Sequence, residues 1–312
     1  MKRREFLASG AAAAAALTAS GIAQADDSKQ APAEDHDGHG GRFKLKYGPS
    51  PGQFKHHAGD DYLDQIQFAA DQGFRGWEDN GLARRDPALQ EAIGKKLKDN
   101  GMTMGVFVSS ANFGSTNFTT NTSKQYRDQL RENMSKMVEV AQRCGAKWTT
   151  VVPGKVNHRL ELDYQTANVI DNLRVLAEVC EPVGLVVVLE PLNWFANHPE
   201  LYLTKIAQAY LICRGVNSPS IKILDDLYHQ QVTEGHLIKN MEYAWDEIAY
   251  FQVGDNPGRK EPYSGEINYR NVFKYIHDKG YEGVIGMEHG HSVDGIEGEK
   301  KCIAAYRMAD DF

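Results

Sequence analysis

The chain has 312 residues, of which 41% are hydrophobic and 25% are charged. This length and composition support one large domain or two ordinary ones with an apolar core, and they exclude disordered, collagen-like and coiled-coil classes. Lys and Arg number 35 against 42 Asp and Glu, a formal net charge of −7. Nucleic-acid-binding proteins usually present a basic face, so we expect no nucleic-acid partner.

Residues 1–25 have the features of an export signal. A basic start with Arg3-Arg4 precedes Phe6-Leu7, an alanine-rich run and a cleavage-like triplet that ends at Ala25. The arginine pair resembles a twin-arginine signal, and an ordinary secretory signal is the alternative. Residues 26–42 are polar and rich in Gly and acids, which predicts a flexible linker. We expect a periplasmic protein with no membrane segment after signal cleavage.

From residue 43 onward, short apolar runs alternate with amphipathic stretches. Strands are predicted at 43–47, 74–78, 103–109, 147–152, 185–190, 221–226, 248–253 and 283–288. Helices are predicted at 60–72, 86–100, 123–144, 162–183, 200–214, 231–243, 269–279 and 296–309. The fifth strand is continuously apolar, which is typical of a strand buried on both faces of a parallel sheet. Left-handed glycine caps are expected before five strands, at Gly73, Gly101, Gly145, Gly184 and Gly280.

Eight strand–helix units in about 270 residues have the size of a (β/α)8 TIM barrel, which we predict as a single α/β domain over 43–312. The alternative is an open doubly wound sheet, which would carry a glycine-rich phosphate loop after its first strand. Here the first predicted strand is followed by residues 48–52, whose two prolines make a poor helix start. The barrel is therefore the expected fold.

The last four predicted strands end in side chains that bind metals or move protons. They are Glu190, Asp226, Gln252 and Glu288, with Asp225 competing with Asp226 for its role. The carboxyl ends of barrel strands meet at one rim, so we expect these side chains to converge. Carboxylate and amide oxygens suit Mg²⁺ or Mn²⁺, with Co²⁺ or Zn²⁺ as the alternative. The lack of Cys and of a His triad at these ends disfavours a dedicated zinc site.

Several phrases along the chain carry a family resemblance. They are Leu189-Glu190-Pro191-Leu192-Asn193, Asp226-Leu227-Tyr228-His229, the run from Gln252 to Arg259, Gly265-Glu266-Ile267-Asn268-Tyr269, and Gly286-Met287-Glu288. Together they resemble the hydroxypyruvate isomerase branch of the xylose-isomerase-like TIM barrels. The resemblance covers residues 43–290. It implies metal ligands at the four strand ends named above, with Glu190 and Glu288 as the proton-transfer pair. It also implies that substrate is bound by His229, Arg259, Asn193 and Glu266.

The resemblance implies a divalent-metal-dependent isomerase or epimerase of a small keto-sugar or hydroxy-keto acid, working through a metal-stabilised enediolate. Three alternatives remain: a keto-sugar dehydratase or lyase on the same site, a phosphoesterase of the apurinic endonuclease type, and a non-catalytic sugar-binding barrel. The expected partner is a small molecule, and a homo-oligomer is left open. Trp77-Glu78 and Trp194-Phe195 are candidate walls for the sugar, with ordinary rim packing as the alternative. The four cysteines are expected to be buried free thiols on helices.

Overall fold

The computed structural model describes residues 41–312 of the chain. The predicted export signal, and the predicted linker as far as residue 40, lie outside the described residues. The strands are β1 (Lys46–Gly48), β2 (Gly76–Trp77), β3 (Thr103–Met104), β4 (Phe107–Ala111), β5 (Trp148–Val152), β6 (Val186–Leu189), β7 (Ile221–Asp226), β8 (Ile248–Val253) and β9 (Val284–Met287). The α-helices are α1 (Lys55–Ala58), α2 (Tyr62–Asp71), α3 (Pro87–Asp99), α4 (Asn117–Thr120), α5 (Lys124–Cys144), α6 (Leu162–Cys180), α7 (Ile206–Val216), α8 (Leu227–Thr233), α9 (Leu237–Ala244), α10 (Tyr269–Asp278) and α11 (Gly295–Asp310).

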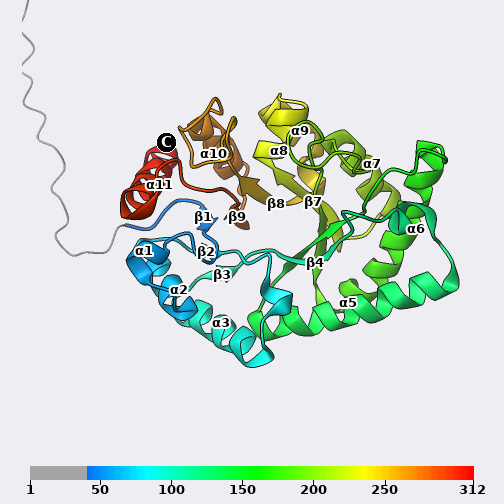
Figure 1. Ribbon diagram of the computed structural model, residues 1–312, viewed down its shortest axis with the longest axis horizontal. Coiled ribbons are helices and arrows are strands. Elements are labelled where there is room, and N and C mark those ends of the chain that lie inside the picture. The colour runs from blue at the N-terminus through cyan, green and yellow to red at the C-terminus, as the bar shows by residue number, and fades with distance from the viewer. Residues whose placement is uncertain (1–40) are drawn as a thin grey trace, which may run out of the picture. The chain divides into compact units, whose positions relative to one another are not determined.

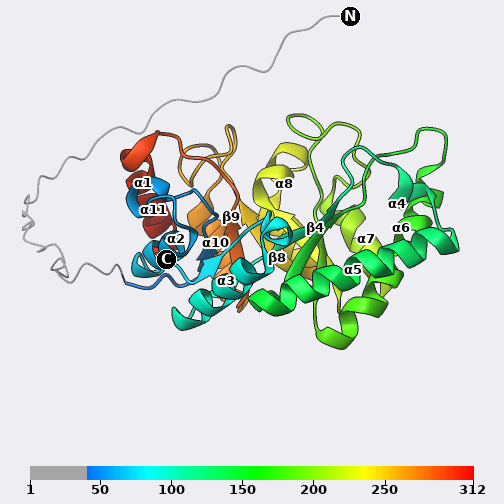
Figure 2. The same ribbon diagram turned by 60° about the horizontal axis from the view of Figure 1, so that its bottom comes forward.

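The strands close into a parallel barrel. Seven of them pair in the order β1-β9-β8-β7-β6-β5-β4, and β2 pairs with β3. Strands β1 and β2 meet where the Glu78 amide donates to the Pro49 carbonyl oxygen at 3.0 Å. The helices lie around the outside of the strands (Figure 1), and they remain outside in the turned view (Figure 2). The predicted α/β TIM barrel is therefore confirmed.

Local sequence explains where the helices begin and end. Helix α5 begins after Ser123, whose hydroxyl accepts from the Tyr126 amide at 3.3 Å, and ends at Gly145 in the left-handed conformation. The other four glycines predicted as caps also have positive φ, so this prediction is confirmed. Within residues 41–312, no helix is both long and apolar enough to cross a bilayer.

The first predicted strand, 43–47, was placed too early. Strand β1 pairs with β9 only from Lys46 onward. The preceding backbone bonds to a side chain instead, because the Lys44 amide donates to Asp310 Oδ2 at 2.7 Å. The pairing of β1 with β9 therefore starts only after the residues whose amides donate to Asp310.

The third predicted strand, 103–109, is two strands. Strand β3 pairs with β2, whereas β4 pairs with β5 and runs on to Ala111. The interruption is at Gly105, where an added Cβ would lie 2.3 Å from the Tyr250 hydroxyl oxygen. The close approach of this ring admits only glycine, and the chain changes partners there.

Two predicted helices have different bounds. The helix predicted at 200–214 begins six residues later, because the backbone around Leu201 pairs with the loop after β5. The helix predicted at 231–243 is the two helices α8 and α9. They are separated at Gly235 and His236, which have φ of 60° and 56°. A left-handed backbone at two consecutive residues cannot continue a right-handed helix.

The barrel interior is filled in layers. One layer consists of fully buried apolar side chains, Val106, Val188, Leu224, Tyr250 and Val284. Successive residues of a strand face opposite sides, so the residue two positions later along each strand also faces inward. On β7 and β8 these next residues are Asp226 and Gln252, which are register partners. The polar site therefore lies directly on an apolar floor.

Burial of the four thiols leads to a first testable prediction. Cys144, Cys180, Cys213 and Cys302 are free and buried on their helices, as predicted. Burial raises the pKa of the first three to about 12. We expect a thiol-specific disulfide reagent at pH 8 to label none of them in the native protein and all four in denaturant. Rapid labelling of the native protein, or fewer than four reactive thiols after unfolding, would contradict this arrangement.

Candidate active site

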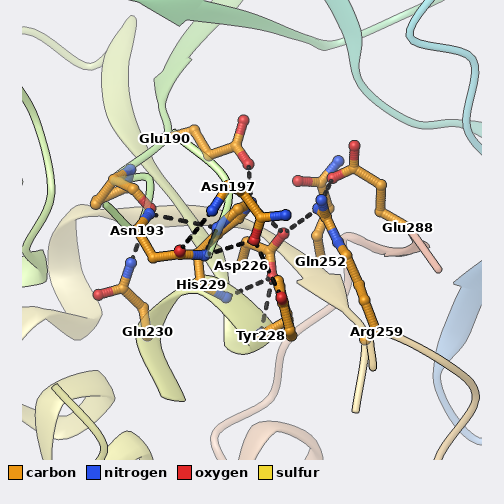
Figure 3. Close-up of polar contacts among 12 residues, drawn as sticks. Glu190, Asn193, Asn197, Asp226, Tyr228, His229, Gln230, Gln252, Arg259 and Glu288 are labelled. Atoms are coloured by element: carbon orange, nitrogen blue, oxygen red, sulfur yellow. Dashed lines mark hydrogen bonds and ion pairs between the residues drawn. The ribbon is translucent and has the colours of Figure 1, made fainter. Parts of the chain in front are cut away.

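A cavity of about 250 Å³ opens at the carboxyl ends of the strands. Its lining includes Glu190, His229, Arg259 and Glu288 from four successive strand-end segments, together with apolar side chains of β4 and β5. Figure 3 shows Glu190 and Glu288 on either side of Asp226. The barrel thus brings these strand ends together, as predicted.

Glu190, Asp226 and His229 form a potential metal-binding group. One ligand atom from each lies within 4.8 Å of the others. Among residues 41–312, these three are the one group of His, Cys, Asp or Glu side chains close enough to hold a metal ion together. Asp226 also caps α8, since its Oδ1 accepts from the Tyr228 and His229 amides at 2.8 and 3.2 Å. Its other oxygen, Oδ2, accepts from Arg259 Nη2 at 2.9 Å. Asp225, the competing candidate, precedes it on β7 and so faces the opposite side of the strand.

Gln252 offers an amide oxygen to the same group. Its Nε2 donates to Glu78 Oε1 at 2.8 Å, whereas its Oε1 is buried and has no hydrogen-bond partner among the described residues. A buried carbonyl without a partner is costly unless a ligand completes it. Three carboxylates and this oxygen make a hard, oxygen-rich donor set, so these residues fit a divalent cation.

Arg259 holds two of the carboxylates. Its Nη2 donates to Asp226 Oδ2 at 2.9 Å and to Glu288 Oε2 at 3.0 Å. Burial raises the pKa of Glu288 to about 7 even though Arg259 opposes this, and Asp226 raises it further. Burial also raises the pKa of Glu190 well above its usual range, with the charges of Glu288 and Asp226 adding to the effect. In the absence of a cation, burial therefore favours the protonated form of both carboxyl groups.

His229 is fixed as a hydrogen-bond donor toward the cavity. The Asn193 side-chain oxygen accepts from the Ala196 and Asn197 amides at 2.9 and 3.2 Å, which sets the orientation of the amide group. Its Nδ2 therefore donates to His229 Nδ1 at 2.6 Å. The neutral ring then carries its proton on Nε2, which lies 3.6 Å from Asp226 Oδ2 and 3.8 Å from Glu190 Oε1. With its proton on Nε2, the ring has no lone pair for a cation on this side, so His229 can donate to a substrate oxygen and is not counted among the metal ligands.

The structure does not bring every predicted residue into the cavity. Glu266 is exposed and bonds to Asn256 Nδ2 and Gln231 Nε2 at 2.6 and 3.1 Å, away from the cavity lining. Its predicted substrate role stays a prediction. Asn193 is fully buried behind His229, so its contact is with the ring.

The predicted aromatic walls are wrong for the second strand. Trp77 and Glu78 are each 1% exposed and do not line the cavity. The Trp77 ring packs outward and donates to the Tyr62 hydroxyl of α2 at 2.9 Å, whereas Glu78 faces the barrel interior against β8. Trp194 and Phe195 are exposed but are not among the cavity-lining residues. The wall is instead built in part by Phe113, whose ring stacks on His198 at 5.2 Å between centroids.

Sequence reasoning missed the polar contacts of two residues that follow β2: Glu78 was named only as a candidate wall, and Asn80 was not named. Glu78 bonds to Gln252, and Asn80 Nδ2 donates to Glu288 Oε1 at 3.2 Å. The phrase Glu78-Asp79-Asn80 at a strand end was the available signal. It has the same placement in the barrel as the four ligand-type residues, but it comes from an earlier strand.

Comparison with known proteins decides the family. The model of the xylose isomerase-like TIM barrel family matches residues 66–306. The chain belongs to the xylose isomerase-like TIM barrel family. Within this family it is similar to hydroxypyruvate isomerase of Escherichia coli, with 32% identity over 162 residues that cover 52% of the chain and 62% of that protein. It is also similar to 2-oxo-tetronate isomerase of Pectobacterium atrosepticum, with 27% identity over 75% of the chain and 90% of that protein. The chain thus spans less than two thirds of the hydroxypyruvate isomerase it matches.

Two solved structures share the barrel fold. A Brucella melitensis protein described as an AP endonuclease of family 2 has a TM-score of 0.69 at 23% identity, over 81% of this chain and 96% of that one. The 3-keto-D-glucoside 4-epimerase of Escherichia coli has a TM-score of 0.66 at 22% identity, over 85% and 99%. At these identities the likeness shows the fold alone.

The state of His229 can be tested directly. Burial lowers the pKa of this ring to about 4, so we expect a neutral ring at pH 7. Long-range ¹H–¹⁵N NMR of the metal-free protein should show its proton on Nε2. Asn193→Ala removes the short side-chain bond to Nδ1 and leaves only the backbone amide of residue 193, at 3.4 Å, so the population of the Nδ1-protonated tautomer should rise. The exposed His277 gives the reference signal within each spectrum. A charged His229 ring at pH 7, or no change in Asn193→Ala, would contradict the assignment.

Proposed function

We propose that this protein is a divalent-metal-dependent isomerase or epimerase that acts on a small keto-sugar or hydroxy-keto acid. The observation that carries the proposal is a cavity of this family's barrel lined by Glu190 and Glu288. Asp226 lies beside Glu190 and shares the Arg259 guanidinium with Glu288, and Gln252 is the register partner of Asp226. The names of the similar hydroxypyruvate and 2-oxo-tetronate isomerases support the same class of substrate. A cavity of about 250 Å³ suits a molecule of a few carbon atoms.

The difficult step in such reactions is removal of a proton from a carbon next to a carbonyl. A bound Mg²⁺ or Mn²⁺ would supply Lewis-acid stabilisation of the negative charge that develops on the substrate oxygens. Glu190 and Glu288 line the cavity from the ends of β6 and β9. One carboxylate removes the proton at its oxygen, and the other, as the acid, returns a proton to carbon. In an isomerisation the proton returns to the neighbouring carbon and the hydroxyl proton moves to the former carbonyl oxygen. In an epimerisation the proton returns to the opposite face of the same carbon. Burial raises the pKa of both groups, to about 7 for Glu288, which favours the protonated form that the acid needs.

Two further side chains position the substrate. His229 presents its Nε2 proton to a substrate oxygen, since its other nitrogen is occupied by Asn193. Arg259 offers a planar guanidinium at the cavity wall, suited to a carboxylate or to a pair of hydroxyl oxygens. A hydroxy-keto acid satisfies both donors.

The proposal predicts that Glu190→Gln and Glu288→Gln each lower kcat by about 100-fold or more, because each removes one partner of the proton transfer. The reaction is followed by NMR in D₂O with hydroxypyruvate, 2-oxo-tetronate and short ketoses in the presence of Mn²⁺. Deuterium should enter the product at carbon in a metal-dependent manner, and a chelator should stop the exchange.

Glu282→Gln, an exposed glutamate just before β9, is the matched control and should leave the rate unchanged. Near-normal turnover of Glu288→Gln would overturn the assigned proton transfer. Loss of water from the substrate would instead indicate a dehydratase or lyase, and cleavage of abasic DNA would indicate a phosphoesterase. Sugar binding that a chelator does not change, without turnover, would indicate a binding protein.

We also propose that the protein is exported to the periplasm by the twin-arginine route. The support is the sequence of residues 1–25, which lies outside the described structure. Replacing both arginines, Arg3→Lys and Arg4→Lys, keeps the positive charge. The double variant should therefore stay in the cytoplasm only if the export machinery recognises the arginine pair itself and not its charge. Cell fractionation measures this, with Lys2→Arg as the control. Undiminished periplasmic accumulation of the double variant would favour an ordinary secretory route.

A further inference from the structure

A buried carboxyl group lies next to the candidate metal site and takes no part in the proposed proton transfer. Glu78, just after β2, is 1% exposed. Its Oε1 accepts from Gln252 Nε2 and its Oε2 accepts from the Tyr250 hydroxyl, each at 2.8 Å. Both partners are on β8, two residues apart, so they face the barrel interior from the same strand.

The orientation of the Gln252 amide depends on this carboxyl group. An amide side chain has nearly the same shape when its oxygen and nitrogen are exchanged, so packing alone does not choose between the two orientations. The bond to Glu78 does choose, because it requires the nitrogen on that side. The Gln252 carbonyl oxygen is then turned away, buried and unpartnered within residues 41–312. It lies in the layer that also holds Asp226, the register partner of Gln252 on β7.

The space for the Glu78 carboxyl group comes from a glycine on the next strand. Gly286 of β9 is the register partner of Gln252. An added Cβ at Gly286 would lie 1.7 Å from Glu78 Oε2 and 2.6 Å from Glu78 Cδ. Strand β9 thus has no side chain in this layer, and the carboxyl group of Glu78 fills the position. Three strands together build the arrangement.

We propose that Glu78 is a positioning residue that holds the Gln252 amide with its oxygen available to the cation. This inference rests on the proposed function, since it concerns the same metal site. With the amide reversed, the positive end of its dipole would face the cation and repel it. Residues that hydrogen-bond to metal ligands commonly change metal affinity by about 10–100-fold when they are replaced.

Two variants of Glu78 separate the acceptor from the ionisable group. Glu78→Met removes both, whereas Glu78→Gln removes the ionisable group and keeps an acceptor oxygen for Gln252. We expect Glu78→Met to weaken Mn²⁺ binding about 10–100-fold and Glu78→Gln to bind more tightly than Glu78→Met. Binding of Mn²⁺ to the full chain is measured by titration, with free Mn²⁺ detected by electron paramagnetic resonance. Circular dichroism and thermal unfolding without metal show whether each variant keeps its fold.

An exchange of the two side chains gives a test that a merely structural role would fail. Gln252→Glu alone places two carboxyl groups against each other. Adding Glu78→Gln restores an amide–carboxylate hydrogen bond in the reverse direction and leaves the second oxygen of residue 252 for the cation. We expect the double variant to bind Mn²⁺ at least about 10-fold more tightly than Gln252→Glu.

Each outcome decides the inference. Parent-like Mn²⁺ affinity in a folded Glu78→Met overturns it, as does a double variant that binds no more tightly than Gln252→Glu. If Glu78→Met does not fold, the double variant decides alone. A parent protein that binds Mn²⁺ and catalyses no carbon-bound proton exchange overturns the proposed function while this inference stands on the binding data. A parent protein that binds no Mn²⁺ overturns both.

Discussion

The alternation of side chains along the barrel strands is the constraint on which the site depends. Each inward apolar residue of the floor is followed, two positions later, by another inward residue, and on β7 and β8 this is a ligand-type side chain. The same spacing relates Val188 of β6 to Glu190 just beyond it. The floor is dry and rigid, so the polar layer above it is held in place by packing below and by hydrogen bonds within.

Gathering several carboxylates in a buried place is unfavourable without compensation. The protein offsets part of this cost with the Arg259 guanidinium and with the amides at the start of α8, which donate to Asp226. The remaining excess of negative charge raises the pKa of Glu190 and Glu288. The same excess of negative charge would favour a bound cation, and a cation bound there would in turn lower the pKa of both carboxyl groups.

The fold and the set of strand-end residues could be predicted because both follow from local patterns. Glycine caps, apolar runs and the unit length are properties of short segments, and barrel closure brings the ends together. Glu78 could not be placed in this way. Its role depends on a missing side chain at Gly286, far away in the chain, and on the amide of Gln252. Likewise, the break between α8 and α9 includes a left-handed backbone at His236. Histidine is not a residue type that predicts this conformation from sequence.

The space shared by Glu78 and Gly286 has a consequence for the evolution of the family. A larger residue at position 286 would collide with the long carboxyl side chain, and a shorter one at position 78 would leave a hole that a side chain from β9 could fill. A substitution at either position is therefore unfavourable without a matching substitution at the other. Family members should therefore change at the two positions together, and lineages that kept the glycine should also have kept an acidic or amide side chain opposite it.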